Sequence, residues 1–523
     1  MRRLPCLFFL IAAPLASQQT VPERSNFTQT SSHADVLAFV DSLQRLGAGI
    51  RVGRLGLSPQ GRVLPYVIAS RPLVDGPAEA QRTGKPIIYL QANIHAGEVE
   101  GKEAALRLLR ELTLGSLHPL LDSVVLLVVP LYNADGNDAF GPQERNRPGQ
   151  NGPASVGLRA NGQGLDLNRD YVKQEAPETR AATRLLDRWD PDLFIDLHTT
   201  DGSYHGYALT YSPGLHPNSS PANEYIRDKF LPEVRARMRA RHQQEVFWYG
   251  NFRNADPDSL RLGWETYDPR PRFGTNWVGL RGRMAILSEA YSHAEFRARI
   301  DATYNFVLEI LRLAAAERAT LKSLALAASR QRPDSVTLRS VLAPPLALDV
   351  IAELTQRAGE GSGPFARRQP TGVFKTIRMP VFDRFMAARK EAMPAAYLLP
   401  PQHAQLAELL RLQGVEVRRI RSDWQGAAEA FLVDSLVVEP LFEGHRTIRV
   451  EGAWHARDVV LTPGWFLVSS DQRLGVFAAY LLEPASEDGL VTWNFLDRDL
   501  RQGQDAPILR SRIPLPVPAE LLP

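Results

Sequence analysis

A histidine and a glutamate three residues apart, His95 and Glu98, are side chains that bind metal ions in proteins. An imidazole nitrogen and a carboxylate oxygen are both zinc ligands, and this spacing lets the two side chains point at one ion. Gly97 lies between them and allows the backbone to bend toward a metal. Such pairs also occur by chance, so a zinc site requires a third ligand, a base and substrate-binding groups from elsewhere in the chain.

Two further side chains of this kind each end a predicted buried strand. One such apolar run ends at His198 and a later one ends close to Glu289. The carboxyl ends of strands in an open α/β sheet meet at the edge where ligands bind. We therefore expect His95, Glu98 and His198 to hold one Zn²⁺ ion per chain, with room for a water molecule.

Glu289 then remains as a second carboxylate beside the metal. Zinc lowers the pKa of its bound water and polarises a carbonyl group. A neighbouring carboxylate can accept the proton of that water and pass it to the leaving amine. The pattern predicts hydrolysis of a peptide or amide bond with Glu289 as the general base.

Arginines in a loop-rich segment are candidates for binding an anion. The pair Asn168–Arg169 ends this segment, and Arg147 and Arg159 precede it. Arginine binds carboxylates through two parallel hydrogen bonds. These side chains are therefore expected to hold a free carboxyl terminus and to stabilise the oxyanion of the scissile carbonyl group. The sequence leaves open whether Arg147 or Arg159 has the second role.

The elements that must position these residues alternate between strands and helices. Strands are predicted at residues 63–69, 85–91, 124–131, 191–200 and 282–291. Helices are predicted at residues 32–55, 104–112, 178–189, 224–243 and 296–328. This alternation predicts an α/β fold with a largely parallel or mixed sheet and helices on both faces. Residues 141–164, rich in Gly, Pro, Asn and Arg, predict a long functional loop.

The chain of 523 residues is too long for one hydrophobic core, so two domains are expected. Residues 25–330 form the predicted catalytic domain, and a linker follows near residues 330–334. Residues 340–523 contain short strands and one helix that ends at Gly414, which predicts a smaller α+β accessory domain.

Residues 1–17 have a basic start, an apolar stretch and small residues, the pattern of a secretory signal peptide. Its removal would eliminate Cys6, the single cysteine, so a secreted or periplasmic protein without thiol chemistry is expected. The net charge of +3 gives no case for nucleic acid as a partner. No later segment predicts a membrane span, and no obligate protein partner is evident.

The order of these motifs resembles that of the carboxypeptidase A-type zinc metallocarboxypeptidase family. The resemblance extends over residues 60–315 and rests on five ordered elements: His95–Glu98, Asn133–Gly136, Asp166–Arg169, His198 and Glu289. Two features depart from the family. Ala134 stands where the family often has proline, and the family's digestive members lack a C-terminal part like the one here.

For the catalytic domain, the resemblance implies a mixed, mostly parallel eight-stranded sheet with helices on both faces. The smaller C-terminal α+β domain is expected from the chain's own residues and not from the resemblance. It implies His95, Glu98 and His198 as zinc ligands and Glu289 as the general base.

The resemblance also implies a substrate-binding set. Asn168 and Arg169 would bind the C-terminal carboxylate of a peptide substrate. The segment around Arg159 resembles the bacterial amidase and cytosolic branches of the family, whereas Arg147 fits the spacing of the digestive branch. Tyr267 lies at a suitable distance before Glu289 to match the family's mobile tyrosine.

Three functions fit these expectations. The first is a secreted zinc metallocarboxypeptidase that removes C-terminal residues from peptides. The second is a zinc amidase of the same fold that acts on murein peptides or N-acyl amino acids. The third is a catalytically silent protein that binds peptides or glycans. Such proteins usually lack a metal ligand or the base, whereas this sequence contains all of them.

Overall fold

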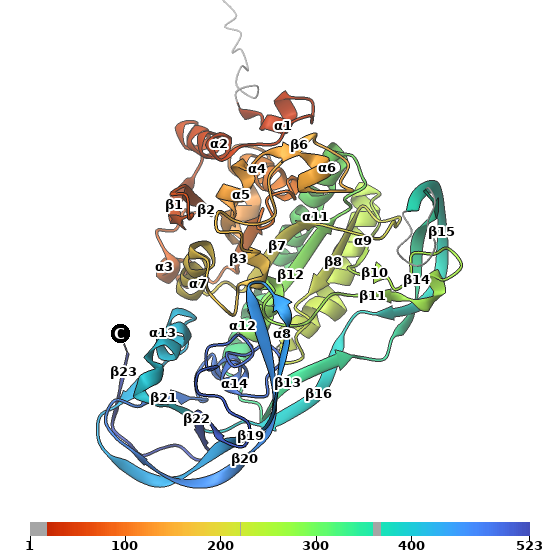
Figure 1. Cartoon of the computed structure of the whole chain (residues 1–523). Coiled ribbons are helices and arrows are strands. Elements are labelled where there is room, and N and C mark those ends of the chain that lie inside the picture. The colour runs from red at the N-terminus through yellow and green to blue at the C-terminus, as the bar shows by residue number, and fades with distance from the viewer. Residues whose placement is uncertain (1–17, 220, 359–367, 523) are drawn as a thin grey trace, which may run out of the picture.

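A central eight-stranded sheet organises the first part of the chain in the computed structural model. The structure describes residues 18–219, 221–358 and 368–522 (Figure 1). The predicted signal peptide, residues 1–17, lies outside the described residues. In spatial order the strands are β1 (Ile50–Leu57), β2 (Val63–Ala69), β4 (Val125–Val129), β3 (Ile87–Ala92), β7 (Leu193–Thr199), β12 (Met284–Ala290), β8 (Leu209–Pro213) and β9 (Val246–Trp248). Neighbouring strands β4, β3, β7 and β12 are parallel, and β2 and β8 flank them in antiparallel pairing. The sheet is mixed, with a parallel centre, as expected.

Successive side chains of the central strands enter two different apolar clusters, one on each face of the sheet. In β3, Ile88 and Leu90 belong to one cluster, and Ile87 and Tyr89 belong to the other. Such burial on both faces explains why these strands appear in the sequence as continuous apolar runs.

Helices cover both faces. In the first cluster the sheet packs against α2, α4, α9 and α11, and in the second against α7 and α10. The helices of this part are α1 (Val21–Arg24), α2 (His33–Arg45), α3 (Pro77–Arg82), α4 (Glu100–Thr113), α5 (Ala134–Asp138), α6 (Gln143–Asn146), α7 (Pro177–Trp189), α8 (Pro221–Tyr225), α9 (Leu231–His242), α10 (Gly274–Leu280), α11 (Phe296–Ala316) and α12 (Arg318–Ser329).

Two predicted helices are wrong in extent. The helix predicted at residues 32–55 ends at Arg45, because a turn with Gly47 at φ +83° follows, and β1 occupies the remainder. The helix predicted at residues 296–328 is interrupted at Glu317, which divides it into α11 and α12. No glycine or proline marks this interruption in the sequence.

Where the structure describes it, the C-terminal region is rich in β-strands and contains two α-helices. A seven-stranded sheet has the order β20, β19, β22, β17, β21, β18, β23. The elements are β13 (Ser335–Leu342), β14 (Leu346–Arg357), β15 (Arg368–Phe382), β16 (Phe385–Ala392), β17 (Ala396–Leu399), α13 (Ala404–Leu412), β18 (Arg418–Ile420), β19 (Trp424–Phe442), β20 (His445–Leu461), β21 (Phe466–Ser469), α14 (Gly475–Leu482), β22 (Asp505–Ser511) and β23 (Ala519–Leu521). The strand β13 begins before the boundary expected at residue 340.

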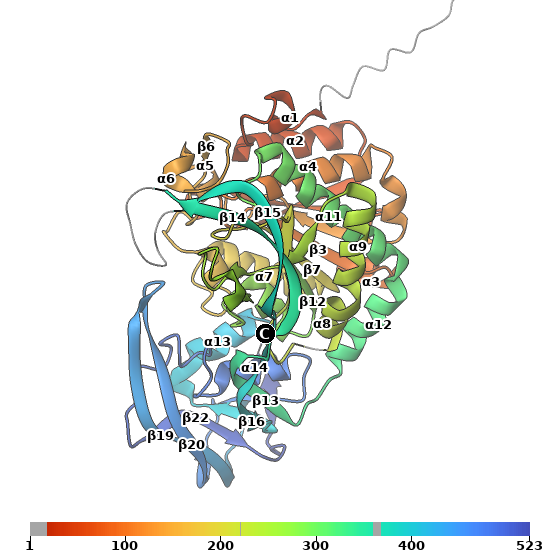
Figure 2. The same ribbon diagram turned by 90° about the vertical axis from the view of Figure 1, so that its right-hand side faces the viewer.

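The C-terminal region is joined to the first part by extensive packing. Buried side chains of α13 and α14, such as Leu406 and Phe477, belong to the same apolar cluster as Trp277 of α10. The long strands β14 and β15 curve along the first part of the molecule (Figure 2). There they form one sheet with two short strands of that part, β10 (Asn251–Phe252) and β11 (Trp264–Glu265).

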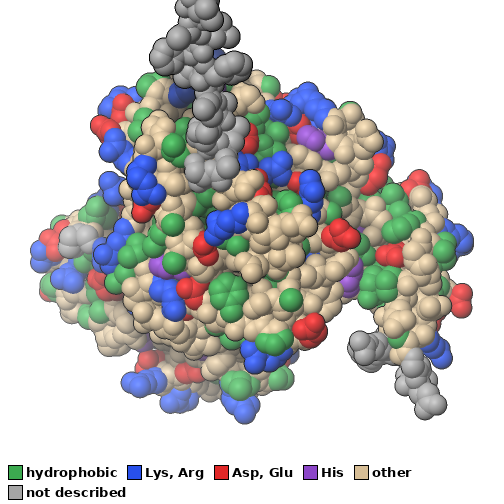
Figure 3. All heavy atoms as spheres, turned by 90° about the horizontal axis from the view of Figure 1, so that it is seen from above, with side chains coloured by type: hydrophobic (Ala, Val, Ile, Leu, Met, Phe, Trp, Pro, Cys, Tyr) green, Lys and Arg blue, Asp and Glu red, His purple; other side chains and the backbone are tan. Residues whose placement is uncertain are grey.

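Acidic and basic side chains are interspersed on the face shown in Figure 3, in keeping with the net charge of +3. Within the described residues, no helix combines the length and the apolar character needed to cross a bilayer.

Candidate active site

His95 and Glu98 lie on the connection between β3 and α4, at the carboxyl edge of the sheet. The connection begins at Asn93, which has a φ of +62° and donates a hydrogen bond of 3.1 Å from Nδ2 to the carbonyl oxygen of Glu98. A side chain at Gly97 would begin 3.1 Å from the carbonyl oxygen of Gly157. The turn therefore requires a small residue at Gly97 because another loop approaches it closely.

His198 and Glu289 are brought together by the parallel pairing of β7 with β12. The register of the two strands places His198 directly opposite Glu289. Residues opposite each other in a sheet project from the same face, here the face covered by α7 and α10. The two side chains therefore enter the same space at the strand ends.

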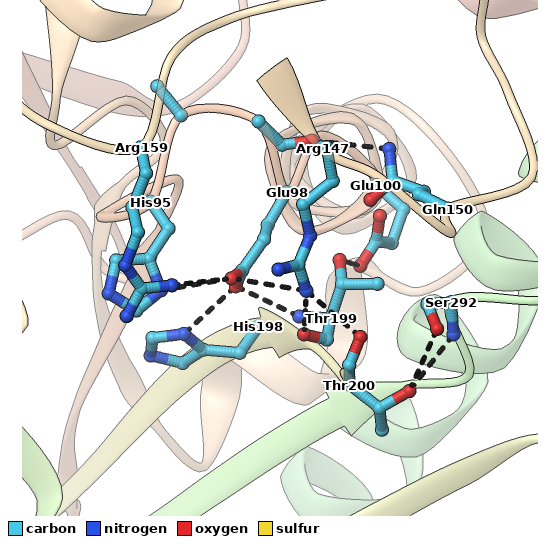
Figure 4. A network of polar contacts seen from close by, with 12 residues as sticks. His95, Glu98, Glu100, Arg147, Gln150, Arg159, His198, Thr199, Thr200 and Ser292 are labelled. Atoms are coloured by element: carbon cyan, nitrogen blue, oxygen red, sulfur yellow. Dashed lines mark hydrogen bonds and ion pairs between the residues drawn. The ribbon is translucent and has the colours of Figure 1, made fainter. Parts of the chain in front are cut away.

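His95, Glu98 and His198 form a compact group of metal-binding atoms (Figure 4). One ligand atom from each lies within 4.8 Å of the others. The Nδ1 atoms of His95 and His198 lie 3.0 and 3.1 Å from the carboxylate oxygens of Glu98. Among the described residues, no other group of three or more histidine, cysteine and acidic side chains is arranged to hold a metal ion.

The opposite nitrogen of each imidazole faces a second carboxylate. His95 Nε2 lies 3.1 Å from Asp166 Oδ1, and His198 Nε2 lies 3.1 Å from Asp196 Oδ2. A carboxylate in this position fixes which ring nitrogen carries the proton and leaves the other nitrogen free to bind a metal. The donor set therefore fits a zinc ion bound through both Nδ1 atoms and Glu98.

Glu98 is buried, yet its surroundings favour the ionised form. Burial alone would raise its pKa, but His95, Arg147 and hydrogen bonds to both imidazoles hold the pKa well below the usual range. The backbone N–H of Thr199 also donates to Glu98 Oε2 at 3.0 Å. A carboxylate that stays ionised is the form that binds a cation.

A cavity of about 310 Å³ opens at this group. Eight of the nine side chains expected at the site from the sequence line it: His95, Glu98, Arg159, Asn168, Arg169, His198, Tyr267 and Glu289. The ninth, Arg147, is not among the lining residues.

The two candidate oxyanion arginines occupy different positions. Arg147 Nη2 donates hydrogen bonds of 2.7 and 2.9 Å to the carbonyl oxygens of Thr199 and Thr200 (Figure 4). Its guanidinium is thereby committed to the end of β7. Arg159 lines the cavity, donates to Asp166 at 2.9 Å and has Nη1 3.5 Å from Glu98 Oε1. Arg159 is therefore the arginine that can reach a ligand in the cavity.

Asn168 is oriented by a backbone group. The N–H of Gly274 donates to Asn168 Oδ1 at 2.9 Å, which assigns the oxygen and leaves the amide NH₂ group for the cavity. Arg169 lies with its guanidinium 4.1 Å above the ring of Phe273 and donates to its neighbouring carbonyl, that of Asn168, at 2.9 Å. Both residues line the cavity with donor groups.

Glu289 and two tyrosines, Tyr249 and Tyr267, also line the cavity. Burial raises the pKa of Glu289 well above the usual range, and His198 opposes this shift only in part. A bound cation would lower that pKa again, because it favours the carboxylate. Tyr267 donates to Asn276 Oδ1 at 3.3 Å and packs edge-on against Tyr249, with ring centroids 5.6 Å apart.

Sequence reasoning missed several residues of the site. Asp166 and Asp196 face the two histidines, and Tyr249 and Asp201 line the cavity. Asp166 was visible in the sequence as part of the motif that ends in Asn168–Arg169, and Asp196 precedes His198 by two residues in the same strand, which places both on one face. No local pattern marks Tyr249.

The family model and the relatives that match this chain are all described as carboxypeptidases. The model of the zinc carboxypeptidase family matches residues 36–256. The chain is 23% identical over 489 residues to carboxypeptidase 2 of Trichophyton equinum, an alignment that covers 87% of this chain and 81% of that protein. Carboxypeptidase 2 of Trichophyton rubrum matches with the same identity and coverage.

Two solved structures are also similar. Carboxypeptidase A from Helicoverpa armigera is 16% identical and covers 55% of this chain and 75% of its own, with a TM-score of 0.40. A metallo-carboxypeptidase from Pseudomonas aeruginosa is 20% identical, and the match covers 55% of this chain and 68% of that protein, with a TM-score of 0.38.

The sequence comparisons thus agree in class: the matching family model is that of zinc carboxypeptidases, and the Trichophyton relatives, which align with most of the chain, are carboxypeptidases. The strand that carries Glu289 lies beyond the residues matched by the family model, but it pairs with β7 inside them. The similarity to the Trichophyton proteins covers more of the chain than the first 330 residues and so reaches into the C-terminal region.

We predict that the purified protein contains one zinc ion per chain and that His198→Ala removes it. Asp196→Asn should weaken zinc binding by about ten- to hundredfold, because the imidazole loses the carboxylate that orients it. Elemental analysis and titration with a competing chelator measure both effects. His216→Ala, which removes another buried histidine, is the control and should keep its zinc. Full zinc content in His198→Ala would contradict the assignment.

A second prediction concerns Glu178 at the start of α7, whose Oε2 accepts a hydrogen bond of 3.1 Å from Asn161 in the segment between Arg159 and Asp166. Burial raises the pKa of Glu178 from 4.5 to about 7. The folded state thus prefers the neutral acid, and stability falls as the pH rises from 4.5 to 7, when the buried group must ionise.

Glu178→Gln keeps the acceptor and removes the charge. We expect it to raise the free energy of unfolding at pH 8 by roughly 2 kcal/mol and to change it little at pH 4. Denaturant titrations at the two pH values measure this difference, and exposed Glu144→Gln is the control. Equal effects of Glu178→Gln at both pH values would disprove the explanation.

Proposed function

We propose that this protein is a secreted zinc carboxypeptidase that hydrolyses the C-terminal peptide bond of peptides. One observation carries the proposal: a single cavity is lined by the His–Glu–His group, by Glu289, and by the donor groups of Asn168 and Arg169. The first group suits a metal, the second suits proton transfer, and the third suits a carboxylate. Carboxypeptidase chemistry needs these three functions side by side.

His95, Glu98 and His198 would hold the zinc ion, and the ion would supply a water of lowered pKa and polarise the scissile carbonyl. The chain's own contribution is to keep these ligands in their binding forms. Asp166 and Asp196 orient the two imidazoles, and the network around Glu98 keeps its carboxylate ionised.

Glu289 would accept the proton of the attacking water and deliver it to the leaving amine. Its position opposite His198 in the sheet places it beside the metal group. Burial raises the pKa of Glu289, and a bound cation would lower it again and favour the carboxylate that accepts the proton. The role also requires a side chain held in one place, which burial at the end of β12 provides.

Asn168 and Arg169 would bind the substrate's terminal carboxylate. The amide NH₂ of Asn168 and the guanidinium of Arg169 present several N–H donors to the cavity, and charged pairs of this kind are stronger than neutral hydrogen bonds. Binding at this point places the last peptide bond over the metal group. An enzyme built in this way removes one residue from the end of a chain.

Arg159 would stabilise the charge that develops on the carbonyl oxygen, since it lines the cavity beside Glu98. Arg147 would instead support the end of β7, which carries His198. Tyr267, which also lines the cavity, would contact the substrate. The N-terminal segment, with its basic start and apolar stretch, supports export as a secreted or periplasmic protein.

Glu289→Gln should reduce kcat for a blocked dipeptide by at least about a thousandfold while zinc remains bound, because glutamine cannot accept the proton. Steady-state kinetics and zinc analysis on the same preparation measure this. In the wild type, kcat/KM should fall on the acid side with an apparent pKa set by the protonation of Glu289. Wild-type turnover in Glu289→Gln would remove Glu289 from this role.

Arg169→Met should raise KM for blocked dipeptides by about a hundredfold, with a smaller effect on kcat, because it removes a charged hydrogen bond to the substrate carboxylate. Murein peptides are assayed in parallel to separate a peptidase from an amidase. The control is Arg145→Met, which changes an exposed arginine outside the cavity lining. An unchanged KM in Arg169→Met would contradict carboxylate binding by Arg169.

A further inference from the structure

The segment 266–273 between β11 and α10 forms one wall of the active-site cavity. Its residues Tyr267, Asp268 and Phe273 all line that cavity. Asp268 and Phe273, together with Arg169, also line a second cavity of about 630 Å³. The other residues that line the second cavity belong to the C-terminal region and include Leu441 and Thr447.

The segment therefore separates two open spaces. Its middle is held by the first part of the molecule, because Asn276 Nδ2 donates hydrogen bonds of 2.9 and 3.3 Å to the carbonyl oxygens of Asp268 and Arg270. Both ends are held by the C-terminal region.

The first end is held by strand pairing. Trp264 and Glu265 of β11 pair in parallel with Val381 and Phe382 of β15. The backbone N–H of Thr266 continues this pairing with a hydrogen bond of 2.9 Å to the carbonyl oxygen of Phe382. The residue directly before Tyr267 is thus bonded to the C-terminal region.

The second end is held by a buried ion pair. Asp488 accepts hydrogen bonds of 2.8 Å from both the backbone N–H and the Nε of Arg272, and its Oδ1 lies 2.5 Å from Arg272 Nη2. The indole N–H of Trp493 donates to the same carboxylate at 2.9 Å. The side chains of Asp488 and Arg272 are 0% and 5% exposed. Because both carboxylate oxygens of Asp488 accept hydrogen bonds and such bonds have preferred directions, the ion pair has a defined geometry.

The residues that follow Arg272 transmit this geometry to the proposed carboxylate binders. The ring of Phe273 supports the guanidinium of Arg169 at 4.1 Å, and the N–H of Gly274 orients the amide of Asn168 at 2.9 Å. One short stretch of backbone thus places both side chains. That stretch is fixed by a carboxylate from the C-terminal region.

We propose that Asp488 is a positioning residue for substrate binding: it holds Arg272, and through Phe273 and Gly274 it sets the geometry of Arg169 and Asn168. The C-terminal region then has a direct part in the activity, since the site for the substrate's carboxylate is incomplete without it. This inference rests on the proposed function, in which Arg169 and Asn168 bind that carboxylate.

The test compares variants of the ion pair in the zinc-loaded full chain. Asp488→Asn keeps the shape of the side chain but removes its negative charge and one of the two oxygens that accept hydrogen bonds from Arg272. Arg272→Met combined with Asp488→Leu removes both charges, so that no charge is left buried alone, and replacements of this kind are tolerated by many proteins. Arg272→Lys is a milder third variant, which keeps the positive charge but loses the planar guanidinium with its several N–H donors. Arg473→Met is the control, because Arg473 pairs with Asp187 across the same two regions but touches neither cavity.

We expect the ion-pair variants to raise KM for a blocked dipeptide by about tenfold and to change kcat little. Inhibition by the free amino acid product, which carries the carboxylate, should weaken by the same factor. Inhibition by acetohydroxamate, which binds only the metal, should not change. Arg272→Lys should have a smaller effect than Asp488→Asn, and Arg473→Met should match the wild type. A general loss of structure would instead weaken both inhibitors.

Unchanged KM and product inhibition in any folded ion-pair variant would overturn the inference, as would equal losses for both inhibitors. Arg169→Met is measured in the same series. If it alone weakens product inhibition, the proposed function stands and the role of Asp488 fails. If Arg169→Met has no effect, the assignment of the carboxylate site itself is wrong.

Discussion

A buried carboxylate, that of Glu98, is the group on which the site depends. An ionised carboxylate is costly to bury unless several charged or polar groups surround it. Here the groups come from separate segments: His95 from the same turn, His198 from β7, and Arg147 and Arg159 from the long loop. The carboxylate is stable only when the sheet, the turn and the loop have all assembled. The same assembly produces the arrangement that suits a metal ion.

The C-terminal region is more than an addition to this core. It shares an apolar cluster with the helices α7 and α10, and β15 extends the small sheet that contains β11. The β19–β20 hairpin reaches back toward the first part of the molecule, where the carbonyl of Glu443 and the ring of His445 contact Lys173 and Glu175 (Figure 1). The segment between the two cavities is likewise held by both regions, through the pairing of β11 with β15 and the ion pair of Arg272 with Asp488. A chain cut near residue 330 would expose that wall and a large apolar surface.

Much of the fold could be predicted because its central strands are buried on both faces. The strand predicted at residues 63–69 matches β2, and those predicted at residues 191–200 and 282–291 contain β7 and β12. Continuous apolar runs of this length have few other interpretations. The errors occurred where the chain is only partly buried. The strand β1 was included in a helix, and the interruption at Glu317 was missed because no local glycine or proline marks it.

For the site, the sequence by itself determined which side chains lie at the edge of the sheet. The apolar runs that contain His198 and Glu289 predict that these residues lie at the ends of strands. The change from a strand pattern to a helix pattern predicts the same edge for His95 and Glu98. Whether these side chains converge depends on strand order and register, which no local pattern contains. The tertiary structure alone decided that Arg159 lines the cavity while Arg147 supports β7, and it alone brought in Asp488. The physical reason is that burial follows from local composition, whereas hydrogen bonds between segments distant in the sequence exist only after the chain has folded.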